Sequence, residues 1–209
     1  MYKVLIEGSS YSGCEYRKMF VKMGFIVVDG VEEDPDLVCF TGGADVNPAL
    51  YGKALHPTTH YSERRDDICL ALYEYAITNS KHMVGICRGS QFLCVANGGE
   101  LWQDIDGHCG NHEALTINNE KFVVTSTHHQ EMNPKGGQVL LTASCGSYRS
   151  TTRPDGLPVR YIATTPTIEA VLWKDTKCLG VQGHPEFAQA GVVFKSWFDV
   201  QVRELLCVD

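Results

Sequence analysis

The sequence predicts an α/β fold with an open, mostly parallel twisted sheet flanked by helices, and with a small extra β region. Two observations support this prediction. In the first half of the chain, apolar runs and helical patterns follow the order strand, helix, strand, strand, helix, strand, helix. Such alternation is typical of parallel sheets whose crossovers are helices. In the second half, several short apolar runs precede a single C-terminal helical pattern.

The first four elements follow from local patterns. Residues 3–7 (KVLIE) predict a strand that ends in the turn sequence GSSYSG. Residues 14–23 predict a helix with apolar residues on one face, and Gly24 provides its C-cap. The apolar runs 25–28 and 36–40 predict two strands, and the second leads into the loop TGGADVNP.

The next three elements are the clearest in the chain. Residues 64–79 carry apolar side chains at helical spacing. Residues 82–86 (HMVGI) predict a short strand, and residues 89–96 predict a helix that stops at an Asn-Gly-Gly sequence. This strand–turn–helix unit contains the strongest functional signal.

The second half is predicted to consist mainly of strands. They are expected at residues 122–125, 138–142, 169–173 and 178–182. Residues 144–158 are rich in Ser, Thr, Gly and Pro and predict a long loop. Apolar residues at helical spacing predict a final helix over residues 189–206. Neither a repeat nor a linker interrupts the chain, so we expect one domain over residues 1–209.

Composition restricts the functional classes. The chain of 209 residues is 44% hydrophobic and 21% charged, which is typical of a globular protein. Its net charge of −7 opposes binding to nucleic acid. No apolar run reaches ~18 residues, and the N-terminal stretch is too short and polar for a secretory signal, so neither a membrane nor secretion is expected. The nine cysteines form no regular framework, which favours a reducing cytoplasm.

The sequence GICRGSQ is typical of a nucleophile elbow. In it, Cys87 stands between Gly85 and Gly89, at the turn from a strand to a helix. Small residues at these two positions permit a sharp turn that raises the cysteine above the sheet edge. The helix N-terminus favours the thiolate over the thiol. Alternatively, Cys87 would be one more small buried residue, but the strand and helix around it favour the nucleophile.

A thiolate nucleophile needs an oriented base. His184 follows the strand CLGVQ directly, so it is expected at the same sheet edge as Cys87. Glu186, two residues further on, can accept the other imidazole N–H, and Pro185 stiffens the turn. We therefore predict a Cys87–His184–Glu186 triad.

An oxyanion hole is expected at the same edge. Gly42 and Gly43 follow the third strand and permit backbone N–H groups to turn toward a ligand. The hole would consist of the N–H of Gly43 and the N–H of Arg88, the residue after the nucleophile.

Together these motifs resemble the class I glutamine amidotransferase superfamily, and most closely its γ-glutamyl hydrolase-like branch, which includes γ-glutamyl-GABA hydrolases. The resemblance rests, in order, on GGADVNPALYG (42–52), Arg65-Asp66, GICRGSQ (85–91), NGGELWQDI (97–105), HHQ (128–130), IEAV (168–171) and LGVQGHPE (179–186). It implies a flavodoxin-like sheet without a cofactor. The stretch 147–167 does not match the branch and is expected to shape the leaving-amine pocket.

The resemblance implies hydrolysis of a γ-glutamyl amide, either glutamine or a γ-glutamyl conjugate. Cys87 would attack the side-chain carbonyl, His184 would transfer the proton to the leaving amine, and water would hydrolyse the γ-glutamyl thioester. The implied substrate-binding residues are Gly42, Asp45, Arg65, Gln91, His128, His129 and Gln130. For Gln91 the alternative is a solvent-facing helix position, and for the two histidines it is a structural hydrogen bond at a strand end.

Two functions remain open: a stand-alone hydrolase, and a glutaminase component that supplies ammonia to a separate synthase. The chemistry is the same, and the sequence leaves open whether a synthase or a second copy of the chain is the partner. An inactive binding module is disfavoured by the intact Cys87, His184 and Glu186. Chaperone- or deglycase-like proteins with a cysteine elbow lack the HPE sequence.

No metal site is expected from the sequence. His108, Cys109 and His112 lie in a Gly- and Asn-rich loop, and no fourth ligand stands nearby along the chain. The acidic pair Asp66-Asp67 is expected on a solvated helix face or at a cap.

Overall fold

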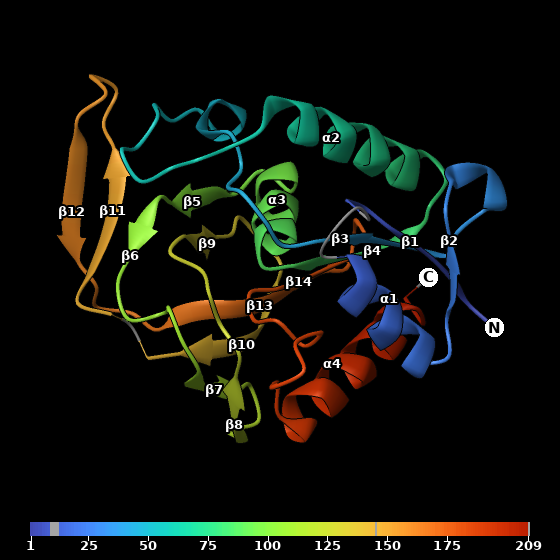
Figure 1. Cartoon of the computed structure of the whole chain (residues 1–209). Helices are drawn as coiled ribbons and strands as arrows, with labels where there is room; N and C mark the ends of the chain where they lie inside the picture. Colours follow the sequence, from blue (N-terminus) through green and yellow to red (C-terminus); the bar gives the residue numbers. More distant parts are fainter. Residues whose placement is uncertain (9–12, 145, 209) are drawn as a thin grey trace.

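A nine-stranded sheet forms the centre of the protein (Figure 1). The structure is a computed structural model and describes residues 1–8, 13–144 and 146–208. The predicted turn after the first strand includes residues 9–12, which lie outside this description. The strand order is β2-β1-β3-β4-β14-β13-β10-β7-β8.

The first five strands in this order run parallel to one another. They are β2 (Ile26–Val28), β1 (Lys3–Ile6), β3 (Leu37–Phe40), β4 (His82–Ile86) and β14 (Cys178–Val181). Each is short and almost wholly apolar, as expected of a strand covered on both faces. The predicted α/β class is confirmed.

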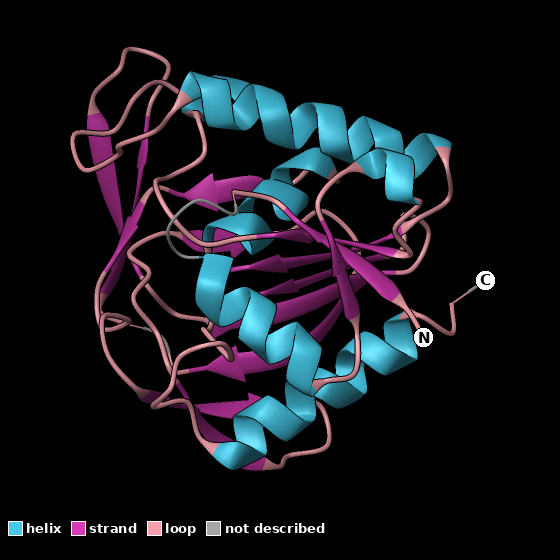
Figure 2. Cartoon of the chain, turned by 45° about the vertical axis from the view of Figure 1, so that its right-hand side comes forward, coloured by secondary structure: helices cyan, strands magenta, loops and turns pink. Residues whose placement is uncertain are grey.

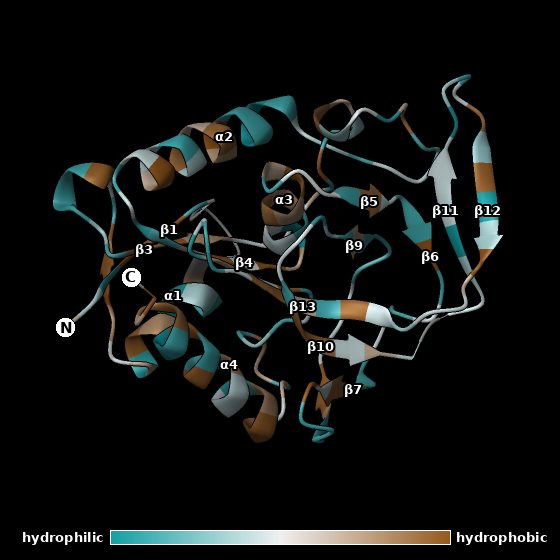
Figure 3. Ribbon diagram, turned by 180° about the vertical axis from the view of Figure 1, so that it is seen from behind, coloured by the Kyte–Doolittle hydropathy of each residue, from teal (hydrophilic) through white to brown (hydrophobic). Residues whose placement is uncertain are grey.

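Helices cover both faces of this parallel half (Figure 2). α1 (Gly13–Lys22) and α4 (Val192–Leu205) pack on one face, and α2 (Glu63–Thr78) and α3 (Arg88–Ala96) pack on the other. Alternate residues of one strand face opposite helices: in β3, Leu37 lies in the core with α1 and α4, whereas Val38 lies in the core with α2 and α3. Hydrophobic residues accordingly gather on the central strands and the helix faces that cover them (Figure 3).

The other half of the sheet is antiparallel. It contains β13 (Thr167–Trp173), β10 (Gln138–Ala143), β7 (His112–Thr116) and β8 (Lys121–Val124). β13 and β14, which correspond to the strands predicted at residues 169–173 and 178–182, pair antiparallel across the turn KDTK (174–177). Two 3₁₀ helices, η1 (Val31–Glu33) and η2 (Pro48–Tyr51), lie in the connections of the N-terminal third.

Two small sheets form the extra β region. One contains β12 (Pro158–Ile162), β11 (Tyr148–Thr152) and β6 (Asp104–Ile105), and the other contains β5 (Glu100–Trp102) and β9 (Glu131–Asn133). The prediction of a long loop over residues 144–158 is wrong, because β11 pairs with β12 along its whole length. Its Tyr and Thr residues favour a strand once a partner is available, although the composition resembles a loop.

No helix within the described ranges is both long and apolar enough to cross a membrane. Eight of the cysteines are free thiols. Cys145, the ninth, lies outside the described residues.

Candidate active site

Cys87 occupies a strained turn between β4 and α3. Its φ of 54° and ψ of −112° lie in a region that residues other than glycine rarely adopt. The neighbouring glycines are needed for close approach: a Cβ on Gly85 would lie 2.3 Å from the carbonyl oxygen of Gly89, and a Cβ on Gly89 would lie 2.1 Å from that of Phe40. The structure thus forms the predicted elbow, and its packing leaves room only for glycine on either side of the cysteine.

His184 reaches the same sheet edge because β14 is the parallel neighbour of β4. Its Nδ1 lies 2.7 Å from Oε1 of Glu186, and both side chains are buried. The imidazole also stacks on the Phe187 ring, at a centroid distance of 4.3 Å and an interplanar angle of 8°. With Nδ1–H donating to the carboxylate, Nε2 is left for the reaction site.

Gly42 shows that the side chains of Cys87 and His184 are adjacent. A Cβ on Gly42 would lie 3.0 Å from Cε1 of His184 and 3.5 Å from Cβ of Cys87. Burial lowers the pKa of His184, but hydrogen bonds to Cys87 and Glu186 outweigh it and raise the pKa to about 10. The geometry therefore favours an imidazolium between a sulfur and a carboxylate.

The loop after β3 is fixed by Tyr16, a residue that sequence reasoning missed. The backbone N–H of Gly42 donates to the Tyr16 hydroxyl at 3.0 Å. Burial and the nearby charge of Glu186 raise the pKa of Tyr16, so its hydroxyl stays protonated. Gly43, the next residue, is exposed, and its N–H belongs to the loop segment beside Cys87. No sequence motif marks Tyr16, which is one of several apolar residues on α1.

Arg65, predicted to bind substrate, is engaged instead by Glu7 and by the loop after β3. Its Nε and Nη2 donate to the two carboxylate oxygens of buried Glu7 at 3.1 and 2.9 Å. Nη2 also donates to the carbonyl oxygen of Thr41 at 3.0 Å. A Cβ on Gly43 would lie 2.0 Å from Nη1 of Arg65, so the guanidinium packs directly against the glycine loop.

Asp66 supports the elbow from the same helix. It forms a buried ion pair with Arg88, and its other oxygen accepts the backbone N–H of Asn47 at 3.2 Å. The prediction that Asp66 is solvated is wrong: its side chain is buried because it neutralises the guanidinium beneath Cys87. The Arg88 side chain thus points into the core, and only its backbone N–H is available to the site.

Asp45 and His129 form a second polar group near the loop. Oδ1 of Asp45 lies 3.2 Å from Nε2 of His129, and Oδ2 accepts the backbone N–H of His60 at 2.9 Å. On the other side of the ring, Nδ1 of His129 lies 3.6 Å from Asp104. The hydrogen bond to Asp45 raises the pKa of His129, which favours its cationic form.

The other predicted binding residues are buried. Gln91 is not the solvent-facing residue of the alternative prediction, since its Nε2 donates to the carbonyl oxygen of Gln130 at 3.3 Å. Gln130 in turn donates to the Thr59 hydroxyl at 3.1 Å. His128 points away from His129 and toward Glu169 on β13. In the HHQ segment the side chain of His129 is therefore partly exposed, whereas those of His128 and Gln130 are buried.

Thr127 is a further residue that sequence reasoning missed. Its hydroxyl lies 2.9 Å from Nε2 of His184, although the two residues are 57 positions apart. The backbone of His184 is joined to the same segment, because its N–H donates to the carbonyl oxygen of Thr125 at 2.8 Å. Residues 125–127, which precede HHQ, are thus hydrogen-bonded to His184, the candidate base.

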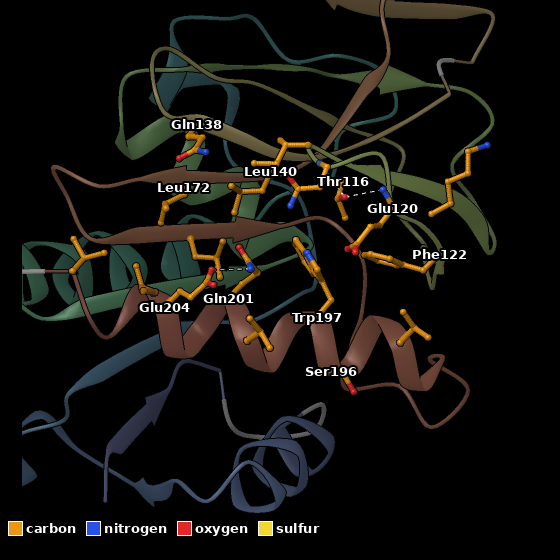
Figure 4. Close-up of a pocket in the computed structure, with 18 of the residues that line it drawn as sticks. Thr116, Glu120, Phe122, Gln138, Leu140, Leu172, Ser196, Trp197, Gln201 and Glu204 are labelled. Carbon is orange, nitrogen blue, oxygen red and sulfur yellow. Dashed lines mark hydrogen bonds between the residues drawn. The ribbon is translucent and has the colours of Figure 1, made fainter.

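A broad groove lies elsewhere, between α4 and the antiparallel strands (Figure 4). Its lining includes Phe122, Leu140, Leu172 and Trp197 and contains none of the triad residues.

Comparisons with known proteins place the chain among similar sequences. The family model described as Peptidase C26 matches residues 28–186. The chain is similar to a candidate glutamine amidotransferase of Mycobacterium tuberculosis, 36% identical over 154 residues that cover 70% of this chain and 49% of that protein. It is also similar to the carbamoyl phosphate synthase small chain of Clostridium perfringens, 29% identical over 75% of this chain and 36% of that protein. The matches thus span about half of the first relative and about a third of the second.

Among solved structures, a glutamine amidotransferase of Thermotoga maritima has a similar fold. The TM-score is 0.60 at 16% identity, and the match covers 98% of this chain and 84% of that chain. The similarity extends to the whole sheet and its helices.

Proposed function

Because the chain belongs to the Peptidase C26 family and is glutamine amidotransferase-like, we propose that it is a cysteine hydrolase of γ-glutamyl amide bonds. The substrate is glutamine or a γ-glutamyl conjugate, and the products are glutamate and ammonia or an amine. The observation that carries this proposal is the His184–Glu186 pair beside Cys87, on a strained strand-to-helix turn.

The proposed reaction has two halves. The Cys87 thiolate attacks the side-chain carbonyl carbon, and the resulting tetrahedral intermediate collapses when imidazolium of His184 gives its proton to the leaving amine. Neutral His184 then takes a proton from water, whose hydroxide attacks the γ-glutamyl thioester carbon, and the Cys87 sulfur leaves. The raised pKa of His184, about 10, supports its starting as the cation.

The backbone N–H groups of Gly43 and Arg88 are proposed to hold the oxyanion. Arg88 is the first residue of α3, so its N–H has no carbonyl partner within the helix. Gly43 is the exposed residue of a loop that Tyr16 and Arg65 hold from behind. One preorganised donor contributes about 2.7–4 kcal/mol to the transition state.

Substrate recognition is assigned to the polar groups around the loop. Asp45 offers a carboxylate to the substrate's α-ammonium, and cationic His129 offers charge to its α-carboxylate. Gln91 and Gln130, which are buried and hydrogen-bonded to each other, support the segment that carries His129. Asp104, which accepts the Tyr148 hydroxyl at 3.0 Å, links His129 to the β11–β12 hairpin. We propose that this hairpin shapes the leaving-amine pocket.

A second candidate function is the glutaminase component of a synthase. The similarity to a carbamoyl phosphate synthase small chain favours it.

The test is a panel of γ-glutamyl amides, glutamine included, assayed for glutamate release by the protein alone. We expect turnover that Cys87→Ala lowers by about 10⁶-fold, because a nucleophile acts as part of a unit. An electrophilic glutamine analogue should label Cys87, and Cys14→Ala, which removes an exposed thiol, serves as the control.

Two other outcomes would contradict the proposal. Activity that survives in Cys87→Ala would exclude this nucleophile. Labelling of Cys87 without turnover of any amide, together with strong stimulation by an added synthase, would favour the glutaminase component instead.

A further inference from the structure

Three histidines and one glutamate from distant parts of the chain meet beside the candidate active site. His108 follows β6, His112 begins β7, His128 lies between β8 and β9, and Glu169 stands on β13. One ligand atom from each lies within 4.8 Å of all the others. No fourth ligand stands near His108 and His112 along the chain, but the fold brings His128 and Glu169 to them from distant positions.

The side-chain polar atoms of this His/Glu cluster are mostly buried, and half of them have no hydrogen-bond partner in the described residues. The side chains of His108, His128 and Glu169 are 2%, 0% and 0% exposed, and that of His112 is 16% exposed. Both ring nitrogens of His108, Nε2 of His128 and Oε2 of Glu169 have no hydrogen-bond partner in the described part of the chain. Buried polar groups are normally satisfied, so four such atoms in one place indicate a ligand.

The hydrogen bonds at the rim determine which atoms face the centre. Nδ1 of His112 lies 3.2 Å from the carbonyl oxygen of Gly110, and Nδ1 of His128 lies 2.9 Å from that of Gln130. A carbonyl oxygen accepts only, so Nδ1 carries the hydrogen in both rings and Nε2 of each neutral ring carries a lone pair. Metal-bound histidines are oriented in this way by their second nitrogen.

These lone pairs face an anion. Oε1 of Glu169 lies 3.1 Å from Nε2 of His112, 3.4 Å from Nε2 of His128 and 3.3 Å from Nδ1 of His108. Two acceptors at such distances repel one another unless a proton or a metal ion lies between them, and the 3.1 Å contact of His112 is a hydrogen bond when its Nε2 carries a proton. The cluster is therefore arranged for a cation.

We propose that His108, His112, His128 and Glu169 bind one Zn²⁺ as a closed structural site. A tetrahedron with Zn–ligand bonds of about 2.05 Å has edges of about 3.3 Å, which matches all three nitrogen–oxygen distances. Three imidazoles and one carboxylate form a donor set that suits Zn²⁺ better than Mg²⁺ or Ca²⁺, which prefer six or more oxygen ligands. Four protein ligands leave no open position for substrate, so the ion is structural.

The ion would fasten the segment that contacts the candidate base. Thr127, whose hydroxyl lies 2.9 Å from Nε2 of His184, is the direct neighbour of His128. Ser126 donates its hydroxyl to the carbonyl oxygen of His108 at 2.6 Å and accepts the N–H of Gly110 at 3.0 Å. Zinc binding would thus hold the two loops and β13 together and fix the position of Thr127.

The first test measures metal content. The full chain, purified without a polyhistidine tag, is expected to contain one Zn²⁺ per chain by plasma mass spectrometry. His108→Ala and Glu169→Gln should each reduce this to a small fraction, whereas His60→Ala, which removes an exposed histidine outside the cluster, should leave it unchanged. Zinc that persists at one equivalent in both cluster variants would overturn the proposal.

The second test does not depend on whether the variants fold. Wild-type protein is treated with a chelator and titrated with Co²⁺, and we expect the intense visible bands of tetrahedral Co²⁺ to saturate at one equivalent. The melting temperature should fall on chelation and recover with Zn²⁺ but not with Mg²⁺. Protein that is folded yet takes up neither Zn²⁺ nor Co²⁺ stoichiometrically would show instead that the imidazoles share protons with Glu169, and the proposal would fail.

Discussion

Replacing Arg65 by Met tests whether this residue holds the glycine loop or binds substrate. The substitution keeps much of the side-chain volume but removes the only cation that contacts Glu7 in the described structure. The carboxylate of Glu7 is 2% exposed, and Thr41 would remain as its donor through N–H at 3.3 Å and the hydroxyl at 3.2 Å. Loss of one partner from a buried pair costs about 3–5 kcal/mol, so we expect the free energy of unfolding to fall by about that amount at pH 7.

The expected loss depends on pH in a defined direction. In the wild type, burial raises the pKa of Glu7, but hydrogen bonding and charge from Arg65 outweigh it and hold the pKa below 4.5. The ionised carboxylate therefore stabilises the wild type above pH 4.5, and this contribution is lost as pH falls through the lower folded pKa. In Arg65→Met burial is opposed only by the Thr41 hydrogen bond and the charge of Arg88, so the pKa of Glu7 rises and the deficit shrinks as pH falls from 7 toward 4.5.

Urea unfolding of the wild type and Arg65→Met at the two pH values measures this deficit. Arg64→Met is the matched control, because Arg64 is the exposed neighbour on the same helix and should change stability by less than about 0.5 kcal/mol. A deficit below about 1 kcal/mol at pH 7, or one of equal size at both pH values, would refute the reasoning from the Glu7 pair. An increase in KM without loss of stability would instead assign Arg65 to substrate binding.

Two further substitutions test the site itself. Glu186→Gln should lower kcat by about 10⁴-fold, as loss of the orienting carboxylate does in a comparable triad. In this variant the imidazole of His184, followed by NMR, should titrate below the value of about 10. An unchanged titration midpoint would mean that Glu186 does not stabilise the imidazolium. Gly42→Ala places a methyl group 3.0 Å from the His184 ring, so we expect kcat to fall by about 10–100-fold with little change in melting temperature. Gly191→Ala, where a Cβ meets no atom within 4 Å, should keep full activity, and equal activity in both glycine variants would contradict the predicted crowding.

Sequence reasoning predicted the features that depend on neighbours along the chain. The elbow is one: a Cβ on Gly85 would meet the backbone of Gly89 four positions further on, so this steric demand arises between residues close in the sequence. The His184–Glu186 contact is another, because two residues apart in a turn can meet without any help from the fold. The parallel strands could be predicted for the same reason, since their apolar runs are continuous and local.

The tertiary structure alone decided the contacts that depend on strand order and register. Arg65 contacts Glu7, which is 58 positions away in the sequence. His108 contacts Glu169 on a strand whose neighbours in the sheet the sequence did not predict. The hairpin of residues 148–162 resembled a loop because its strands become regular only when paired. The sequence gives the chemical type of each side chain, but the order of the strands in the sheet decides which side chains lie next to one another. The sequence therefore determined the nucleophile elbow and the HPE turn, whereas the buried ion pairs and the His/Glu cluster came from the fold.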